Sequence, residues 1–312
     1  MAERVLLTGG AGYIGSMLTP ELLRLGFHVV VVDNFMFKQT SLGHVMAHPN
    51  LELYNGDIRN QDFMKDHLKR ADIIIPLAAL VGAPLCKKDP FAAESVNLKA
   101  PIEMFQMASP SQSILMPTTN SAYGTGGKDH YCDENSPLNP MSLYAKHKVE
   151  VEKALMERDN SISFRLATVF GISPRMRLDL LVNDFVYRAV NDRFIVLFES
   201  HFRRNYIHVR DVVAAFLLGI EKFSSMKGQI YNVGLSEANL TKMQLCLAIK
   251  KHIPDFTFME AQVGEDPDKR DYLVLNEKIE KTGWKAQHGL DMGIKELMKG
   301  YQMIRNSQYS NV

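Results

Sequence analysis

The stretch Thr8-Gly9-Gly10-Ala11-Gly12-Tyr13-Ile14-Gly15 follows a short apolar run, Val5-Leu6-Leu7, and precedes a helical pattern that begins at Ser16. Glycine permits a tight turn and lets the backbone approach a ligand with no Cβ in the way. The N-terminus of the helix that follows offers unpaired N–H groups to an anion. A strand, a glycine-rich turn and a helix in this order predict a cradle for the pyrophosphate of a dinucleotide.

An acidic residue indicates which dinucleotide is bound. Asp33 closes the second apolar run, Val29–Val32, and the matching acid is expected about 20 residues beyond the glycines. A carboxylate there accepts hydrogen bonds from the adenosine ribose and repels a 2′-phosphate, so NAD is the predicted cofactor. Lys38 keeps NADP open as an alternative, because a 2′-phosphate requires a nearby cation.

Apolar runs alternate with helical patterns through the first half of the chain. The expected strands lie near Val5, Val29, Leu51, Ile73, Ile114 and Ser163. The runs Ile73–Ile75 and Ile114–Met116 are apolar at every position, as in strands that are covered on both faces. Residues 91–108 between them form a helical pattern. We therefore expect an α/β protein with a Rossmann-type, doubly wound parallel sheet.

The regular alternation ends after Arg165, where residues 171–177 and the shorter, more charged elements beyond them indicate a second domain. A helix over residues 211–221 and a strand around Ile230 are expected to return to the first domain. The predicted division assigns residues 1–168 and about 205–233 to an NAD-binding Rossmann domain. It assigns residues about 169–204 and 234–312 to a smaller, mixed substrate domain.

Composition excludes several other classes of protein. The chain has 312 residues, a formal net charge of +1 and no basic run, which argues against a nucleic-acid or membrane partner. Its three cysteines are widely spaced, so we expect neither disulfides nor a metal site. The apolar run 71–86 is broken by prolines and glycine and is shorter than the ~18 residues of a membrane span. It is expected to be a buried strand followed by a loop. With no signal peptide visible, a cytoplasmic location is expected.

The candidate catalytic residues are Tyr144 and Lys148. Positions four apart share one face of a helix, so both side chains can point into one cleft. A free phenol has a pKa near ~10, and a neighbouring cation together with the positive nicotinamide ring of NAD favours the phenolate. We expect Tyr144 to act as a base near neutral pH. The alternative is an exposed helix face on which a lysine stem rests against an aromatic ring.

Further motifs occur in a recognisable order: Asp33-Asn34, Gly56-Asp57-Ile58, Leu77-Ala78-Ala79, Tyr144 with Lys148, Arg204-Asn205-Tyr206-Ile207-His208-Val209 with Asp211, and Gly283-Trp284-Lys285. With the glycine-rich turn, they make the chain resemble the extended short-chain dehydrogenase/reductases that act on nucleotide sugars, over nearly its whole length. The resemblance implies that Thr119 and Tyr144 grip the sugar oxygen that is oxidised. It also implies a homodimer, paired through the helices at 91–108 and 144–157, or a higher assembly.

The motifs and the resemblance together predict two sets of site residues. The cofactor set is Gly9, Gly12, Tyr13, Ile14, Asp33, Asn34, Asp57, Ile58, Leu77, Ala78, Ala79, Thr118, Tyr144 and Lys148. The substrate set is Thr119, Asn120, Thr168, Arg175, Asn183, Arg204 and Arg270, with Arg177 as a further candidate. Arginine suits a nucleotide diphosphate because its planar fork pairs with phosphate oxygens, although surface ion pairs remain an alternative for Arg204 and Arg270.

Departures from the family pattern reduce the number of reactions that the chain is expected to catalyse. Related 4,6-dehydratases carry an Asp-Glu pair directly after the catalytic threonine, whereas this chain has Asn120 and Ser121, which do not titrate near pH 7. Dehydration is therefore not expected. Thr168 stands where many epimerases have asparagine, which leaves the sugar-turning geometry of an epimerase in question.

Two segments, 80–86 and 171–180, resemble a narrower branch that oxidises C4 of GDP-D-glycero-D-manno-heptose in bacterial capsule-sugar pathways. In that branch the hydride can leave to a separate acceptor such as 2-oxoglutarate. Three functions therefore remain: a nucleotide-sugar C4 dehydrogenase, a C4 epimerase that retains the ketone, and an NAD-binding protein without catalysis.

Overall fold

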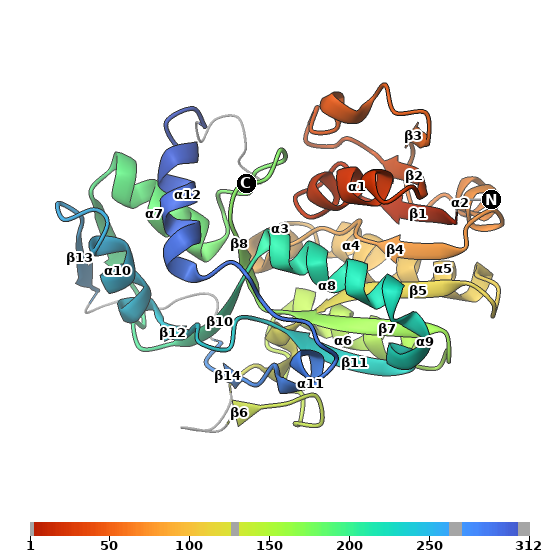
Figure 1. The fold of residues 1–312 in the computed structure, drawn as a ribbon. Helices are drawn as coiled ribbons and strands as arrows, with labels where there is room; N and C mark the ends of the chain where they lie inside the picture. The colour runs from red at the N-terminus through yellow and green to blue at the C-terminus, as the bar shows by residue number, and fades with distance from the viewer. Residues whose placement is uncertain (1–2, 126–130, 262–269, 305–312) are drawn as a thin grey trace.

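The structure is a computed structural model that describes residues 3–125, 131–261 and 270–304. Its largest element is a parallel sheet made of β1 (Arg4–Thr8), β2 (His28–Asp33), β3 (Leu51–Asn55), β4 (Ile73–Pro76), β5 (Ser113–Thr119), β7 (Ser161–Leu166) and β11 (Gln229–Val233). The strand order is β11-β7-β5-β4-β1-β2-β3 (Figure 1). Each strand predicted in the first half of the chain is present, and the predicted fold class is confirmed.

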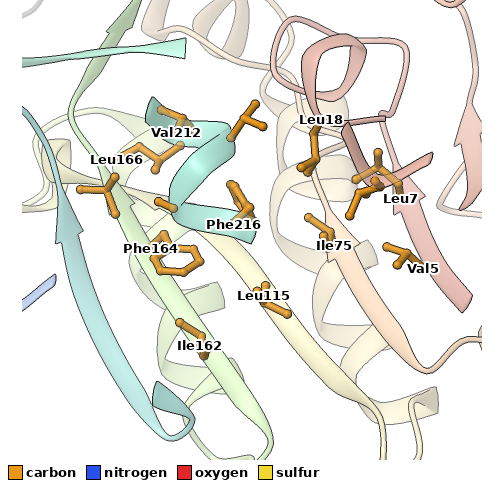
Figure 2. Close-up of a cluster of buried hydrophobic side chains, with 14 of the residues drawn as sticks. Val5, Leu7, Leu18, Ile75, Leu115, Ile162, Phe164, Leu166, Val212 and Phe216 are labelled. Atoms are coloured by element: carbon orange, nitrogen blue, oxygen red, sulfur yellow. The ribbon is translucent and has the colours of Figure 1, made fainter. Parts of the chain in front are cut away.

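Helices cover both faces of this sheet because side chains alternate along its strands. On β1, Val5 and Leu7 face α1 (Gly15–Arg24) and α8 (Val209–Glu221) within one buried apolar cluster. Figure 2 shows side chains of both helices meeting strand residues in this cluster. Leu6 belongs to the cluster on the opposite face. The helices packed there are α2 (Gln61–Leu68), α5 (Ala100–Met107) and α6 (Leu143–Leu155).

The stretch between β4 and β5 differs from the prediction in two places. Residues 91–108 were expected to form one helix, but α4 (Pro90–Glu94) and α5 are joined by a π-helical turn (Ser95–Lys99). Pro101 gives a reason, since it has no amide hydrogen to continue the α-helical pattern. The loop expected after β4 also contains a short helix, α3 (Ala83–Lys88). Gly82 turns the chain at φ +99° just before it.

Outside the large sheet, the chain forms smaller sheets and a separate helical cluster (Figure 1). One sheet joins β8 (Thr168–Phe170), β10 (Arg203–His208) and β12 (Asn239–Thr241). Two pairs are β9 (Phe194–Leu197) with β13 (Thr257–Glu260), and β6 (Tyr131–Cys132) with β14 (Leu273–Val274). The helices α7 (Leu181–Asn191), α10 (Lys242–Lys250) and α12 (Leu290–Gly300) share a second apolar core. Shorter elements are the 3-10 turns Gly43–Val45 and Asn120–Tyr123, α9 (Phe223–Met226) and α11 (Glu277–Glu280).

The division into two domains remains a proposal. Helix α8 and strand β11 lie with the large sheet, although β10, which precedes α8, pairs with β8 and β12 instead. Residues 262–269 and 305–312 of the proposed second domain lie outside the described residues. Within the described part of the chain, no helix has the length and apolar character that crossing a bilayer requires.

Candidate active site

A cavity of about 310 Å³ lies at the carboxyl ends of the parallel strands. Ligands of open α/β sheets bind at this edge, where the strand order reverses, which here is between β1 and β4. All fourteen residues of the predicted cofactor set line this cavity. Its volume is in the range of small-molecule and cofactor sites, roughly 300–1,000 Å³.

The glycine-rich turn leaves the backbone open to a ligand. A Cβ on Gly9, which has φ +68°, would lie 2.6 Å from the backbone nitrogen of Ala78. A Cβ on Gly15 would lie 2.6 Å from the backbone of Gly10. Helix α1 begins here, and over its described length it has no side-chain cap and no acidic residue in its first turn. Its N-terminal dipole and N–H groups therefore suit a pyrophosphate, as NAD would supply.

Asp33 lies at the end of the cavity where the adenosine ribose is expected, and its carboxylate is held in place by hydrogen bonds. Its carboxylate accepts hydrogen bonds from the backbone N–H of Ala11 (3.1 Å) and Phe35 (2.9 Å) and from Nε2 of Gln39 (3.1 Å). Burial raises the pKa of Asp33, while these donors and the charge of Arg175 act in the opposite direction. The carboxylate is thus oriented before any ligand arrives.

Asp57, also on the cavity wall, is paired with Arg59. The Arg59 Nε lies 2.9 Å from Oδ1 of Asp57, and this pairing lowers the pKa of the carboxyl group. The Asp57 carboxylate of the predicted cofactor set is therefore ordered by a neighbouring side chain.

The catalytic end is formed by the first turns of α6. Ser142 caps this helix by accepting a hydrogen bond from the backbone N–H of Ala145 (3.2 Å), so Tyr144 stands in the first turn and Lys148 one turn later. Lys148 is buried, and its Nζ donates to the carbonyl oxygen of Pro117 at 3.1 Å. Burial lowers the pKa of Lys148 to about 8.

The side chains around Tyr144 do not by themselves depress the pKa of its phenol. Burial raises the pKa of Tyr144 to about 12, and the charges of Arg177 and Arg270 only partly oppose this. Desolvation therefore outweighs the protein's own cations, and the predicted phenolate, which also depends on the positive charge of NAD, stays a prediction. A phenolate at neutral pH requires a further positive charge at the phenol.

Thr119 and Arg270 are connected through Ser121. Thr119 Oγ1 donates to Ser121 Oγ at 3.0 Å and accepts from the Ser121 backbone N–H at 3.1 Å. Nη1 of Arg270 donates to the same Ser121 Oγ. Thr119, Ser121 and Arg270 all line the cavity beside Tyr144, so one hydrogen-bond chain joins the candidate catalytic hydroxyl to an arginine.

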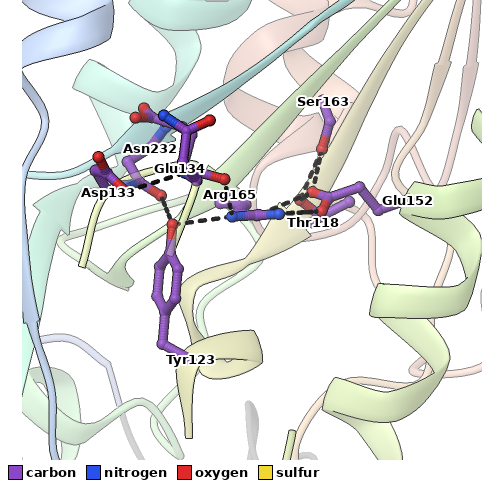
Figure 3. Close-up of polar contacts among 9 residues, drawn as sticks. Thr118, Tyr123, Asp133, Glu134, Glu152, Ser163, Arg165 and Asn232 are labelled. Atoms are coloured by element: carbon purple, nitrogen blue, oxygen red, sulfur yellow. Dashed lines mark hydrogen bonds and ion pairs between the residues drawn. The ribbon is translucent and has the colours of Figure 1, made fainter. Parts of the chain in front are cut away.

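A buried ion pair holds α6 against the sheet (Figure 3). Glu152 of α6 accepts from Nη2 of Arg165 at 2.6 Å, and both side chains are almost completely buried. Thr118 Oγ1 donates to Glu152 at 2.9 Å, so this hydroxyl is directed away from the cavity that Thr118 lines. Arg165 also donates to the hydroxyl of Tyr123 at 3.0 Å, which in turn donates to Asn232. The network connects β5, α6, β7 and β11.

Only part of the predicted substrate set lines the cavity. Thr119, Thr168, Arg175 and Arg270 line the cavity, whereas Asn120, Asn183 and Arg204 are not among the lining residues. Asn183 is buried and uses both ends of its amide on the loop 171–177, accepting from Gly171 N–H at 3.0 Å and donating to the Arg177 carbonyl at 2.8 Å. Its geometry supports a loop-ordering role and not the predicted substrate contact.

Arg204 and Asn120, the other two residues that do not line the cavity, are buried in the protein. Arg204 is buried on β10 with its guanidinium 6.0 Å from the ring centre of Tyr272, which itself lines the cavity. Asn120 is fully buried, and its side-chain oxygen and nitrogen have no hydrogen-bond partner among the described residues. Neither geometry supports direct contact with a ligand.

Sequence reasoning missed lining residues that come from irregular segments, chiefly Phe37, Gln39 and Tyr272. Phe35 and Lys38, which lie near Phe37 and Gln39 in the sequence, have positive φ values of 49° and 52°. Neither is a glycine, so the sequence did not indicate this backbone conformation. For Phe37 and Gln39, closeness to Asp33 in the sequence was a signal that could have identified them.

Comparisons with known proteins agree with this geometry. The NAD dependent epimerase/dehydratase family model matches residues 5–234. The mouse dTDP-D-glucose 4,6-dehydratase is 27% identical over 321 residues, which cover 96% of this chain and 89% of that protein. Low-salt glycan biosynthesis protein Agl12 of Haloferax volcanii is 25% identical over 309 residues, covering 95% and 98%.

Solved structures show the same fold. The crystal structure of Thermus thermophilus UDP-glucose 4-epimerase in complex with NAD matches with a TM-score of 0.83 at 22% identity, over 97% of this chain and 100% of that chain. The family model spans most of the chain, including the glycine-rich turn, Asp33, Tyr144 and Lys148. The chain is therefore an NAD-dependent enzyme that belongs to the NAD dependent epimerase/dehydratase family.

Proposed function

We propose that this enzyme oxidises the C4 hydroxyl of a nucleotide-diphosphate sugar. The observation that carries the proposal is one continuous cavity in which Tyr144, Lys148 and Thr119 share the walls with the glycine-rich turn and Asp33. Arg177 and Arg270 line the same cavity and provide cations for a diphosphate. The first candidate substrate is GDP-D-glycero-D-manno-heptose, in the biosynthesis of a surface polysaccharide.

Each residue has a distinct part in the reaction. Tyr144 removes the proton of the C4 hydroxyl, and Thr119 orients that hydroxyl by hydrogen bonding. NAD, when bound, accepts the C4 hydride and adds the positive charge that the phenol of Tyr144 requires. Lys148 adds a second positive charge below its pKa of about 8. A positioned base contributes about 10²–10⁴ to the rate, so alignment of the sugar by the diphosphate contacts provides much of the remainder.

Dehydration is disfavoured by the residues that follow Thr119. Asn120 is buried away from the cavity, and Ser121 is hydrogen-bonded to Thr119 and Arg270. Neither side chain can act as an acid or a base near pH 7. The chain therefore lacks, at these positions, the acid and base that removal of water requires.

A C4 epimerase is the second candidate function. It performs the same oxidation, retains the ketone and returns the hydride to the other face of the sugar, so NAD is regenerated in each cycle. The description of the matching family favours it. The glycan role in the name of the Haloferax relative supports a polysaccharide context for either reaction.

Product mass separates the two candidates. Purified enzyme with NAD is incubated with GDP-heptose, GDP-mannose and UDP-glucose in turn, and the nucleotide sugars are analysed by mass spectrometry. A product lighter by two hydrogens supports the dehydrogenase, and an isomer of unchanged mass supports the epimerase.

The matched control is Tyr144→Phe, which keeps the ring and removes the base. Turnover is expected to fall by about 10²–10⁴, while NAD binding stays within about threefold. Full turnover in this variant would overturn the assigned base. No turnover by the unmodified enzyme on any of these sugars would overturn the proposed substrates.

We also propose a homodimer or a higher homo-oligomer. The ring of Phe91, on α4, is 85% exposed, and α4 contacts α6, the second helix expected at the interface. Covering such an exposed apolar side chain is a common role of a subunit contact. Sedimentation velocity measures the mass, and a monomer at micromolar concentration would contradict this assembly.

A further inference from the structure

The carboxylate of Asp33 already accepts three hydrogen bonds from the protein. Its Oδ1 accepts from the backbone N–H of Phe35 at 2.9 Å and from Nε2 of Gln39 at 3.1 Å. Its Oδ2 accepts from the backbone N–H of Ala11 at 3.1 Å. A carboxylate has about four acceptor positions on its two oxygens. Asp33 therefore keeps one position, on Oδ2, for a ligand at its end of the cavity, the adenosine end.

The adenosine ribose of NAD needs more than one acceptor. It carries neighbouring hydroxyl groups at C2′ and C3′, and each has a hydrogen to donate. In dinucleotide-binding folds, the acid after the second strand accepts from the 2′-hydroxyl, and that contact would occupy the position left on Asp33. The 3′-hydroxyl then requires a second acceptor next to the same carboxylate, because a buried donor without a partner loses the hydrogen bond that it made with water.

Gln39 has an acceptor that the described part of the chain leaves unused. Its Oε1 is buried and has no hydrogen-bond partner among the described residues, although Nε2 of the same amide donates to Asp33. The reverse orientation of the amide is unfavourable, since Oε1 would then face a carboxylate oxygen and be repelled. Gln39 and Asp33 both line the cavity. Buried oxygens are rarely left unpaired in folded proteins, so this atom indicates a ligand that donates a hydrogen bond.

A tight turn after β2 sets the place of Gln39 in the cavity wall. The backbone N–H of Lys38 donates to the carbonyl oxygen of Phe35 at 2.8 Å, and the two residues have positive φ values of 52° and 49°. Ser41 Oγ donates to the carbonyl oxygen of Ala11 at 2.7 Å, which ties this segment to the glycine-rich turn. Residues other than glycine adopt positive φ at an energetic cost, and such conformations persist where the surrounding structure holds them. The backbone therefore positions Gln39 before a ligand binds.

We propose that Gln39 is a cofactor-binding residue, whose Oε1 accepts a hydrogen bond from the 3′-hydroxyl of the adenosine ribose of NAD. One amide then has two parts in the site, since Nε2 orients Asp33 and Oε1 contacts the neighbouring hydroxyl. No sequence motif assigned Gln39 to the cofactor. The assignment concerns NAD binding alone and does not depend on which sugar the enzyme oxidises.

Calorimetric titration with NAD and two analogues tests this contact. One analogue lacks the 2′-hydroxyl of the adenosine ribose, and the other lacks the 3′-hydroxyl. Gln39→Met keeps the length of the side chain and removes both polar atoms of the amide. It is expected to raise the Kd of NAD and of the 2′-deoxy analogue about fivefold to tenfold, which is the usual contribution of one hydrogen bond. The Kd of the 3′-deoxy analogue is expected to stay within about twofold.

Lys38→Met is the matched control. Lys38 precedes Gln39 in the same turn, but its side chain is exposed and is not among the described residues that line the cavity. The NAD affinity of this variant is expected to stay within about twofold of the wild type.

Three results with Gln39→Met would overturn the proposal. Wild-type affinity for NAD would exclude the contact. An equal loss for all three ligands would mean that Gln39 acts only by holding Asp33, and a loss confined to NAD and the 3′-deoxy analogue would place Gln39 at the 2′-hydroxyl. If the variant does not fold, the wild-type enzyme decides. It is expected to bind the 3′-deoxy analogue about fivefold to tenfold more weakly than NAD, and equal affinity would refute the contact.

Discussion

The two ends of the cavity are ordered by different forces. At the adenosine end, the Asp33 carboxylate is held by N–H donors from Ala11, Phe35 and Gln39. At the catalytic end, burial shifts both Tyr144 and Lys148 toward their neutral forms, with pKa values of about 12 and about 8. Hydrogen bonds prepare the first end for its ligand, whereas the second is desolvated and needs the charge of its ligands to become reactive.

This difference has a structural cause. The adenosine end is built mainly by the turn after β1 and the segment after β2, which are adjacent in the sheet. The catalytic end combines side chains from β5, α6, the loop 171–177 and Arg270. Its geometry therefore depends on packing between distant segments, and changes behind α6 are expected to affect it more than the adenosine end.

The largest expected effect is from Glu152→Ala, which removes one partner of the buried pair behind α6. Arg165 would be left charged and buried, and removal of one partner in such a pair typically costs about 3–5 kcal/mol. Urea denaturation measures this loss. The affinity for ADP-ribose, which probes the adenosine end, is expected to stay within about threefold.

The double variant Glu152→Met with Arg165→Met is the control for this pair. Because it leaves no unpaired charge, its loss of stability is expected to be smaller than the sum of the two single losses. Additive losses would show that the two side chains act independently. If the free energy of ADP-ribose binding fell by as much as the free energy of unfolding, the two ends of the cavity would not be separable.

The next largest effect is expected from substitution of Lys148, because burial of its charged ammonium group destabilises the folded state. A pKa lowered from 10.5 to about 8 corresponds to about 3 kcal/mol of stability lost near pH 7, at about 1.4 kcal/mol for each tenfold change in proton affinity. Lys148→Met is therefore expected to be more stable than the wild type by up to about 3 kcal/mol at pH 7, and to lose turnover.

The difference in stability between Lys148→Met and the wild type is expected to change with pH. The folded state releases the Lys148 proton near pH 8, and the unfolded state keeps it until pH 10.5. The unfolded state then binds more protons between these values, so wild-type stability gains relative to the variant as pH rises. Urea denaturation at pH 7 and pH 9.5 is expected to show the difference shrinking to less than half. A variant less stable than the wild type at pH 7 would mean that the bond to Pro117 outweighs desolvation.

The sequence allowed the cofactor residues to be predicted far better than the substrate residues. Glycines that exclude a Cβ and an acid at the end of β2 are local requirements, and every predicted cofactor residue lines the cavity. Asn183 and Arg204 matched family positions, yet their side chains are used within the protein. Where a polar side chain points depends on tertiary partners, which spacing along the chain does not encode. The raised pKa of Tyr144 was missed for the same reason, because desolvation is a property of the packed site.

The smallest expected effect compares two glycines that both have positive φ. Gly9→Ala places a Cβ 2.6 Å from the Ala78 backbone, whereas Gly26→Ala at φ +88° meets no atom within 4 Å among the described residues. A left-handed conformation costs an alanine about 1–2 kcal/mol, so Gly26→Ala is expected to lose about 1 kcal/mol of stability and to keep its NAD affinity. Gly9→Ala adds a clash with backbone that cannot rotate away, and we expect a loss of about 2 kcal/mol and an increase of at least about tenfold in the Kd of NAD. Thermal unfolding and calorimetry measure both quantities. Equal NAD affinity in the two variants would mean that the turn adjusts to the added carbon, and that the adenosine end is less rigid than its hydrogen bonds indicate.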